Sequence, residues 1–292
     1  MRLIQWWKRA AFGLGLPVFL WTTSSLAQTA NAQDWQLREI TAEVPGHPGT
    51  SYSDLLKQVI PDLEINENST TGHLMEPLRH IAADYGGELP ASIAIGSLQV
   101  STFMMDGRMR TAILTDLGTV ETTVEQPTLL AVFDDGRIPK FLDAVDVGMD
   151  RDTSYGVPAL VNIGPGNQAL VTRSNHFNSN ETFETTAMII LHGSRLKLVD
   201  TFSTYGVRTC NEETRQVLTL EERPVGNANT YSDILATIEE NQTLTGETCD
   251  GEIPRNRFST AHRPFIAGIQ RRAISLPFQM RWKSFSSAQR SK

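Results

Sequence analysis

LLAVFDDGRIPKFLDAVDVGMDRD, residues 129 to 152, places an Asp-Gly pair between two apolar runs and ends in a series of aspartates. An Asp-Gly pair in this setting is typical of a β-hairpin, because glycine adopts the positive φ that a tight turn needs. Comparable turns occur at 105–108, 164–167 and 192–195. Their regular spacing predicts an antiparallel meander of about eight strands between residues 93 and 202.

The apolar runs indicate how this sheet is covered. Segments 129–133, 158–163 and 187–191 are largely apolar, which is typical of strands with protein on both faces. We therefore expect a mainly β protein with flanking helices, of the α+β class. Its strands would form a sandwich or a propeller-like stack.

Three helices are expected beside the sheet. Segments 51–60 and 230–239 both begin with a Ser or Thr followed three residues later by Asp, a variant of the capping box. A third helix is predicted over 74–85, where apolar residues recur at helical spacing.

The ends of the chain indicate export. Residues 1–32 join a basic start, an apolar run and a small-residue segment before Ala30-Asn31-Ala32, as in a signal peptide. No later segment is long and apolar enough to cross a membrane, so we expect no transmembrane segment in the mature chain. An exported, periplasmic or secreted protein enters an oxidising compartment, where the two cysteines, Cys210 and Cys249, are expected to form a disulfide.

Charge is unevenly distributed along the chain. Residues 33–254 hold all 33 acidic side chains, whereas 255–292 hold nine basic ones and no acid. An acidic body repels nucleic acid, so nucleic acid is not an expected partner. The expected organisation is a signal peptide over 1–32, a helical segment over 33–90 that packs on the sheet, an antiparallel β domain with a C-terminal helix over 91–254, and a basic, partly disordered segment over 255–292. An alternative for the basic segment is a final strand that closes the sheet.

A meander separates its connections into two groups. Because the chain reverses at alternating ends, the glycine turns should gather at one end of the sheet and the longer connections at the other. We call the second group, 117–126, 148–157, 174–184 and 204–215, the loop end. Functional groups often lie on loops held by a rigid scaffold, so the loop end is the predicted binding site. Its candidate binding residues are Asn175, His176, Asn178, Asn180, Glu181, Tyr205 and Arg208.

Acidic residues at the loop end raise the question of a metal. Asp150 and Asp152 alternate with Ser154, as oxygen ligands do in calcium loops, and Asp146 lies nearby. The segment lacks the glycine and the bidentate Glu of a helix-loop-helix calcium site. Calcium at Asp146, Asp150 and Asp152 is therefore one alternative, and a solvated acidic loop is the other. No other cofactor is expected.

No catalytic motif is present. The sequence contains no GxSxG, HExxH, phosphate-binding glycine loop or dinucleotide fingerprint. We therefore expect a non-enzymatic periplasmic or secreted binding or envelope-associated protein, with a small molecule, a glycan or an envelope protein as partner. The alternative is a hydrolase, with or without calcium, that uses the loop end, with His176 as the candidate general base.

Overall fold

The computed structural model describes residues 34–66, 69–82, 89–90, 92–121, 125–224, 231–244 and 265–274, the last range by its backbone alone. The predicted signal peptide over 1–32 and the end of the basic segment, 275–292, lie outside these residues. The chain divides into Met1–Ala32 and the unit Gln33–Lys292, to which all described residues belong. That unit is mainly β, as predicted.

The first sheet has five antiparallel strands in the order β1-β5-β6-β7-β8. Its strands are β1 (Trp35–Arg38), β5 (Leu98–Met105), β6 (Arg108–Asp116), β7 (Thr128–Asp134) and β8 (Phe141–Asp146). All of LLAVF at 129–133 is buried in β7, which confirms that this strand is covered on both faces.

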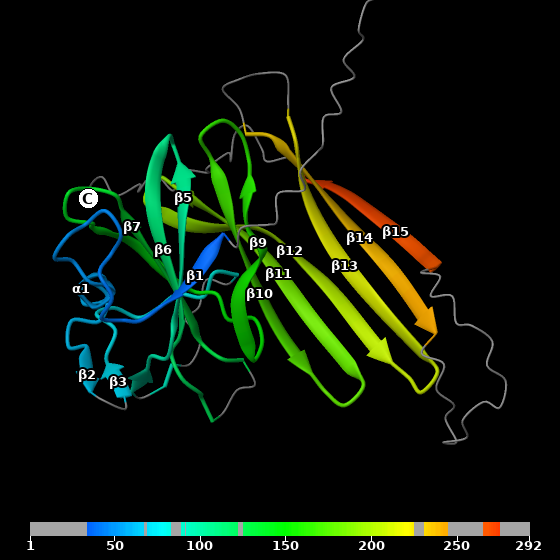
Figure 1. Ribbon diagram of the computed structural model, residues 1–292, viewed down its shortest axis with the longest axis horizontal. Coiled ribbons are helices and arrows are strands. Elements are labelled where there is room, and N and C mark those ends of the chain that lie inside the picture. Colours follow the sequence, from blue (N-terminus) through cyan, green and yellow to red (C-terminus); the bar gives the residue numbers. More distant parts are fainter. Residues whose placement is uncertain are drawn as a thin grey trace, which may run out of the picture. The chain divides into compact units, whose positions relative to one another are not determined.

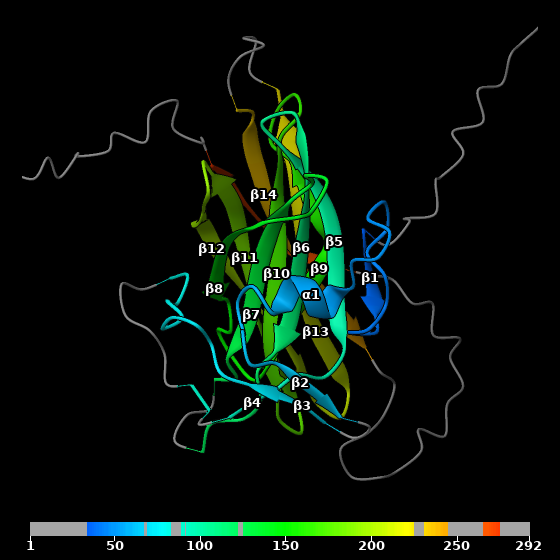
Figure 2. The ribbon, with the colours of Figure 1, turned by 90° about the vertical axis from the view of Figure 1, so that its left-hand side faces the viewer.

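Two apolar clusters cover the two faces of this sheet. On one face, Ile113 and Leu129 belong to a cluster with Leu55 of the single described helix, α1 (Tyr52–Leu56). A small sheet of β2 (Glu64–Asn66), β3 (Ser69–Gly72) and β4 (Ile93–Ala94) lies beside α1 on this face (Figure 2). On the other face, Phe103 and Leu130 belong to a cluster that includes residues of the second sheet.

The second sheet has seven antiparallel strands that follow the chain in the order β15-β14-β13-β12-β11-β10-β9. Figure 1 shows it as a curled sheet that extends from β9 to the edge strand β15. Its strands are β9 (Asp152–Asn162), β10 (Gln168–Phe177), β11 (Glu181–His192), β12 (Arg195–Arg208), β13 (Glu212–Arg223), β14 (Asp233–Leu244) and β15 (Phe265–Ile274).

The curl depends on an interrupted pairing. β12 and β13 pair over three residues only, from Gly206 with Arg215 to Arg208 with Glu213. β13 pairs with β14 along its whole length, and it also approaches β9. Just before β14 begins, the Ser232 N–H donates to the carbonyl of Ile163, the residue that follows β9, at 2.8 Å. The sheet thus folds back toward its own first strand instead of remaining flat.

Apolar side chains close one end of the curl. Ile234 of β14 is fully buried in the same cluster as Val171 and Met188, and Leu220 of β13 packs against that cluster. Burial of a side chain of this size stabilises the fold by about 2 kcal/mol. At the other end of the curl, the described side chains leave a cavity.

The predicted separation of the connections is confirmed. At the end where the glycine turns gather, the Gly107 N–H donates to the carbonyl of Gly166 at 3.1 Å. At the loop end, the Gln126 N–H donates to the carbonyl of Asp150 at 3.0 Å, and the Arg208 N–H donates to that of Asn180 at 2.8 Å. Two of the loop-end connections are shorter than predicted, because the strands run on to leave only 178–180 and 209–211 as turns.

One predicted tight turn is wrong. β7 and β8 are joined by residues 135–140, and Gly136 has no positive φ. The Asp134 carboxylate accepts the N–H groups of Gly136 and Lys140, at 3.2 and 2.8 Å, and so holds a wider loop. The side chain of Asp134 thereby replaces the glycine conformation on which the prediction relied.

The predicted eight-strand meander also needs a correction. Strands β5 to β12 do follow one another in antiparallel order, but four belong to each of two sheets. The break falls at 147–151, where the chain leaves β8 and begins β9. The single eight-stranded sandwich or propeller-like stack is therefore replaced by a five-stranded sheet and a longer, curled sheet.

The prediction of three flanking helices is largely wrong. The capping box at Ser51 and Asp54 is present, but α1 has only five residues. Segment 74–82 is not helical, so 33–90 is not a helical segment in the residues that the structure describes. The predicted helix over 230–239, which would have ended the β domain, is instead part of β14. Within the basic segment, β15 pairs with β14 at the edge of the sheet. The final strand expected at 272–282 overlaps β15 only at 272–274, and the rest of it lies outside the described residues.

We expect alanine at Gly107 or Gly193 to lower the free energy of unfolding by about 1 kcal/mol, because side chains disfavour positive φ. Their φ angles are +68° and +63°, and a Cβ at either would meet no atom within 4 Å, so conformation alone sets the cost. Gly96→Ala is the matched control, since its site is equally open and its φ is ordinary. Urea unfolding of the three variants measures the difference, and equal stability would contradict this explanation.

Candidate functional site

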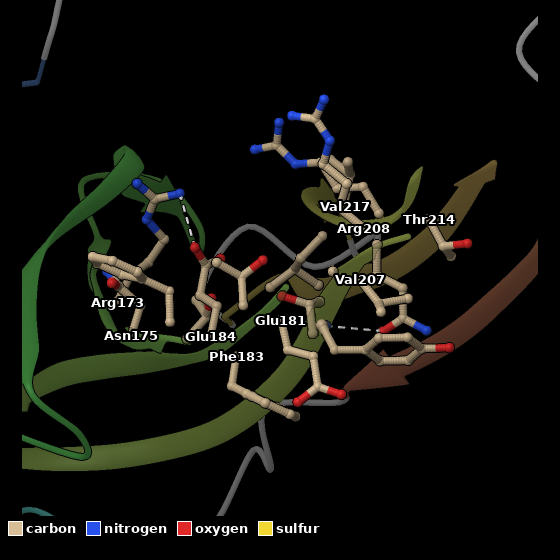
Figure 3. Close-up of a pocket in the computed structure, with 18 of the residues that line it drawn as sticks. Arg173, Asn175, Glu181, Phe183, Glu184, Val207, Arg208, Thr214 and Val217 are labelled. Atoms are coloured by element: carbon tan, nitrogen blue, oxygen red, sulfur yellow. Dashed lines mark hydrogen bonds and ion pairs between the residues drawn. The ribbon is translucent and has the colours of Figure 1, made fainter. Parts of the chain in front are cut away.

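The hollow end of the curl contains a cavity of about 560 Å³ lined by five consecutive strands, β9 to β13. Side chains alternate between the two faces of a strand, so one set of alternate residues on β10, β11 and β12 faces it, and neighbours from the other set of β11 and β12, among them Phe183 and Tyr205, also reach its lining. Figure 3 shows part of this lining. The alternating residues are Val171, Arg173, Asn175 and Phe177 of β10, Thr182, Glu184 and Thr186 of β11, and Thr204, Gly206 and Arg208 of β12.

The structure brings most of the predicted binding residues together. Six of the seven line this one cavity: Asn175, Asn178, Asn180, Glu181, Tyr205 and Arg208. His176 is the exception: it does not line the cavity, and its ring stacks on Phe183, which does. The strand register places Tyr205 on the same face as His176, so Tyr205 reaches the lining from the face opposite to Asn175.

The cavity changes in character along its length. Val171 and Leu220 line the cavity where it meets the apolar cluster that contains Ile234, and both contribute to that cluster. At its mouth, Phe177 and Val157 are 69% and 64% exposed although both are apolar. A cavity with apolar walls and a few converging polar groups is the usual form of a small-ligand site.

The main charged feature of the wall is an ion pair between neighbouring strands. Arg173 Nη1 of β10 lies 3.3 Å from Glu184 Oε2 of β11, as Figure 3 shows. The Nε atom of Arg173 is buried and has no hydrogen-bond partner among the described residues. Such a buried donor is costly to leave unsatisfied, but it is closed to a ligand; the terminal N–H groups of the partly exposed guanidinium are the ones that an acceptor in the cavity can reach.

A polar cluster marks the point where β12 and β13 separate. Gln216 Oε1 accepts the N–H of Tyr205 at 3.3 Å, immediately beyond the last paired residues. Glu240 Oε2 accepts from the Tyr205 hydroxyl at 3.1 Å and from Gln216 Nε2 at 3.0 Å. The hydrogen bond to Glu240 and its negative charge raise the pKa of Tyr205. A side chain thus satisfies the backbone at the end of the ladder.

His176 belongs to a separate arrangement on the other face. Its Nδ1 hydrogen-bonds to Asp150 Oδ2, and its ring stacks on Phe183 with centroids 5.0 Å apart. Asp150 and His176 therefore lie together, as the antiparallel order predicted. Ser174 shares this face, but its Oγ is engaged with the Met149 N–H at 3.1 Å and with Thr153 Oγ1 at 2.8 Å.

The predicted calcium site finds no support. Asp146 is 4% exposed, and its Oδ1 accepts the N–H groups of Thr128 and Gly148, both at 2.9 Å. Asp150 pairs with His176, and Asp152 is exposed at the start of β9. Across the described ranges, no group of three or more His, Cys, Asp or Glu is placed to hold a metal ion. Asp146 instead joins the first residue of β7 to the connection that follows β8, at one end of this strand pair.

The predicted disulfide falls partly outside the described residues. Cys210 lies exposed in the turn between β12 and β13, and Cys249 is not among the residues that the structure describes. The pairing of Cys210 with Cys249 stays a prediction.

Sequence reasoning missed the inner wall of the cavity. Arg173, Thr182, Glu184, Thr186 and Thr204 lie within strands, whereas candidates were sought in loops. Their signal was a run of polar residues, TRSNH at 172–176 and ETFETT at 181–186, that continues strands whose other halves are apolar. Polar residues at inward-facing positions of a strand indicate a cavity there rather than an apolar core.

Comparison with protein-family models, with curated proteins and with solved structures gives no match for this chain. No helix in the described part of the chain has the length and apolar character needed to span a membrane.

We expect Asp146→Ala to lower the free energy of unfolding by about 3 kcal/mol, because it leaves the buried N–H of Thr128 and that of Gly148 without an acceptor. Asp146→Asn keeps an acceptor oxygen and should cost about 1 kcal/mol or less. Chemical unfolding of both variants measures the difference, and equal losses would contradict the structural role.

The unmodified protein and Asp146→Asn should differ in how their stability depends on pH. Burial raises the pKa of Asp146, although the two backbone N–H groups partly offset it. A carboxyl with a raised folded-state pKa stabilises most below its unfolded pKa, and this contribution is lost as pH rises through the folded value. The stability of Asp146→Asn relative to the unmodified protein should therefore increase as pH rises from about 4.

Proposed function

We propose that the protein is a non-enzymatic binding module whose ligand occupies the cavity between β9 and β13. The observation that carries the proposal is that six of the seven predicted binding residues, from β10, β11, β12 and the turn between β10 and β11, line one cavity of about 560 Å³. This volume lies in the range of about 300 to 1,000 Å³ common for small-ligand sites.

The rigidity of the wall supports this proposal. Around the cavity β10, β11 and β12 are held by continuous pairing, β9 pairs with β10 on both sides of an irregularity at 156–159, and β12 and β13 are joined at the mouth. A site on strands is held more precisely than one on loops, so little ordering is needed on binding. A small molecule, a glycan or a segment of an envelope protein are the candidate ligands.

Adjacent residues of β10 provide the test. We expect Asn175→Ala, in the cavity, to weaken binding about fivefold or more, because a ligand loses a polar contact worth about 1 kcal/mol. His176→Ala, on the opposite face, should leave affinity unchanged. A thermal-shift screen of short peptides, oligosaccharides, nucleotides and fatty acids would find the ligand, and calorimetry would compare the two variants.

The screen also decides against the proposal. If no compound stabilises the unmodified chain, or if binding is lost in His176→Ala and kept in Asn175→Ala, the cavity is not the site.

A hydrolase is the second candidate, and the observation that favours it is the pair formed by Asp150 and His176. A carboxylate that holds an imidazole through Nδ1 leaves Nε2 to act as a general base. Esterase or glycosidase activity that disappears in both His176→Ala and Asp150→Asn would establish it. Activity that survives both changes would exclude this pair as the catalytic one.

We also propose that the protein is exported and is periplasmic or secreted, with the signal peptide removed and Cys210 joined to Cys249. The proposal rests on the basic and apolar start of the chain and on the even number of cysteines. The mass of the mature protein, measured before and after reduction and alkylation, tests both parts.

A further inference from the structure

The cavity is electrically neutral in a chain that is otherwise acidic. Its charged lining residues are three arginines and three glutamates, namely Arg173, Arg208, Arg215, Glu181, Glu184 and Glu213. The part of the chain that contains them, residues 33–254, has 33 acidic against 14 basic side chains. A site for cations would be expected to share the acidic excess, and a site for anions to reverse it.

The ion pair in the wall further disfavours charged ligands. An anion that approached Arg173 would have to displace Glu184 or lie beside its carboxylate. A cation that paired with Glu184 would leave the arginine uncompensated. In a partly buried site, either arrangement leaves one charge without its partner, which is strongly unfavourable.

A hydroxyl group meets neither difficulty. It can accept a hydrogen bond from a terminal N–H of the Arg173 guanidinium and donate one to a carboxylate oxygen of Glu184, since the two side chains are 35% and 30% exposed, with the ion pair kept intact. Asn175, Thr186 and Thr204 add donors and acceptors along the same wall. Such a wall suits a ligand with several adjacent hydroxyl groups.

The mouth of the cavity supplies the apolar component that such a ligand needs. Phe177 lines the cavity and is 69% exposed, which is unusual for a phenylalanine in a strand. An exposed aromatic ring offers a flat apolar surface for the C–H face of a sugar ring, and Val157 and Val217 extend it.

We propose that the ligand is an uncharged carbohydrate, a short oligosaccharide whose hydroxyl groups bind the Arg173–Glu184 pair and whose ring faces Phe177. This rests on the proposed function of the cavity and names its ligand class. Neutrality is the selective property, because Arg173 and Glu184, the two charges that face each other in the wall, are already paired.

Calorimetry with trisaccharides of matched length tests the proposal on the mature chain. The neutral probes are maltotriose, cellotriose, mannotriose and triacetylchitotriose. The charged probes are chitotriose, which is the deacetylated and cationic form of the last, and anionic trigalacturonic acid. At least one neutral probe should bind about tenfold or more tightly than either charged probe.

Glu184→Gln gives a second, independent result. The change keeps the shape of the side chain and frees the charge of Arg173 inside the cavity. Affinity for trigalacturonic acid should rise about tenfold, while that for the neutral probe falls. Asp152→Asn is the matched control, since it removes the same charge from an exposed residue that does not line the cavity.

The outcomes separate this inference from the proposed function. The carbohydrate inference is wrong if a charged trisaccharide binds more tightly than every neutral one. It is also wrong if no neutral probe binds while another compound binds in an Asn175-dependent manner. In both cases the proposal of a binding module is kept. If nothing binds in the cavity, both fall. The measurements on the unmodified chain decide even if Glu184→Gln does not fold.

Discussion

The ladder between β12 and β13 stops after three residue pairs, and much of the second sheet depends on that interruption. Beyond Gly206 and Arg215 the two strands separate, so β13 and β14 can turn back toward β9. Their inward side chains then cover Val171 and Met188, which would otherwise lie on an exposed face. The same separation leaves the opposite end hollow. Core and cavity are thus two results of one break in pairing.

The break is itself stabilised by specific groups. Gln216 provides an acceptor for the Tyr205 N–H where a backbone carbonyl would stand in a continued ladder. Gly206 lies at the last pair, where a Cβ would come within 2.8 Å of Thr182 Oγ1. The absence of a side chain there lets β11 and β12 pair closely under the cavity mouth.

Much of the architecture could be predicted because it depends on local chemistry. The glycine turns at Gly107 and Gly193 and the apolar runs of β7 and β11 placed those strands correctly. The antiparallel order also predicted that Asp150 and His176 meet. These features follow from turn conformation and from the alternation of strand direction, which a short stretch of sequence contains.

Other features depend on partners distant in the sequence. Segment 230–239 has a capped start and helical spacing, but Ile234, Ala236 and Ile238 also alternate as in a strand, and pairing with β13 and β15 decides between the two. Asn175 and His176 were assigned to one loop, in which facing directions are undefined. Because β10 continues to Phe177, the two side chains point to opposite faces. Only the strand length could have separated them.

The five-stranded sheet is a wall shared by two apolar clusters. On β6, Ala112 and Leu114 belong to one cluster, and Ile113 between them belongs to the other. Neither layer can therefore come apart without exposing one side of the same strands. Occupation of the cavity, although it lies in the other sheet, therefore protects the layer around α1 only against openings that also separate the shared strands from the second sheet.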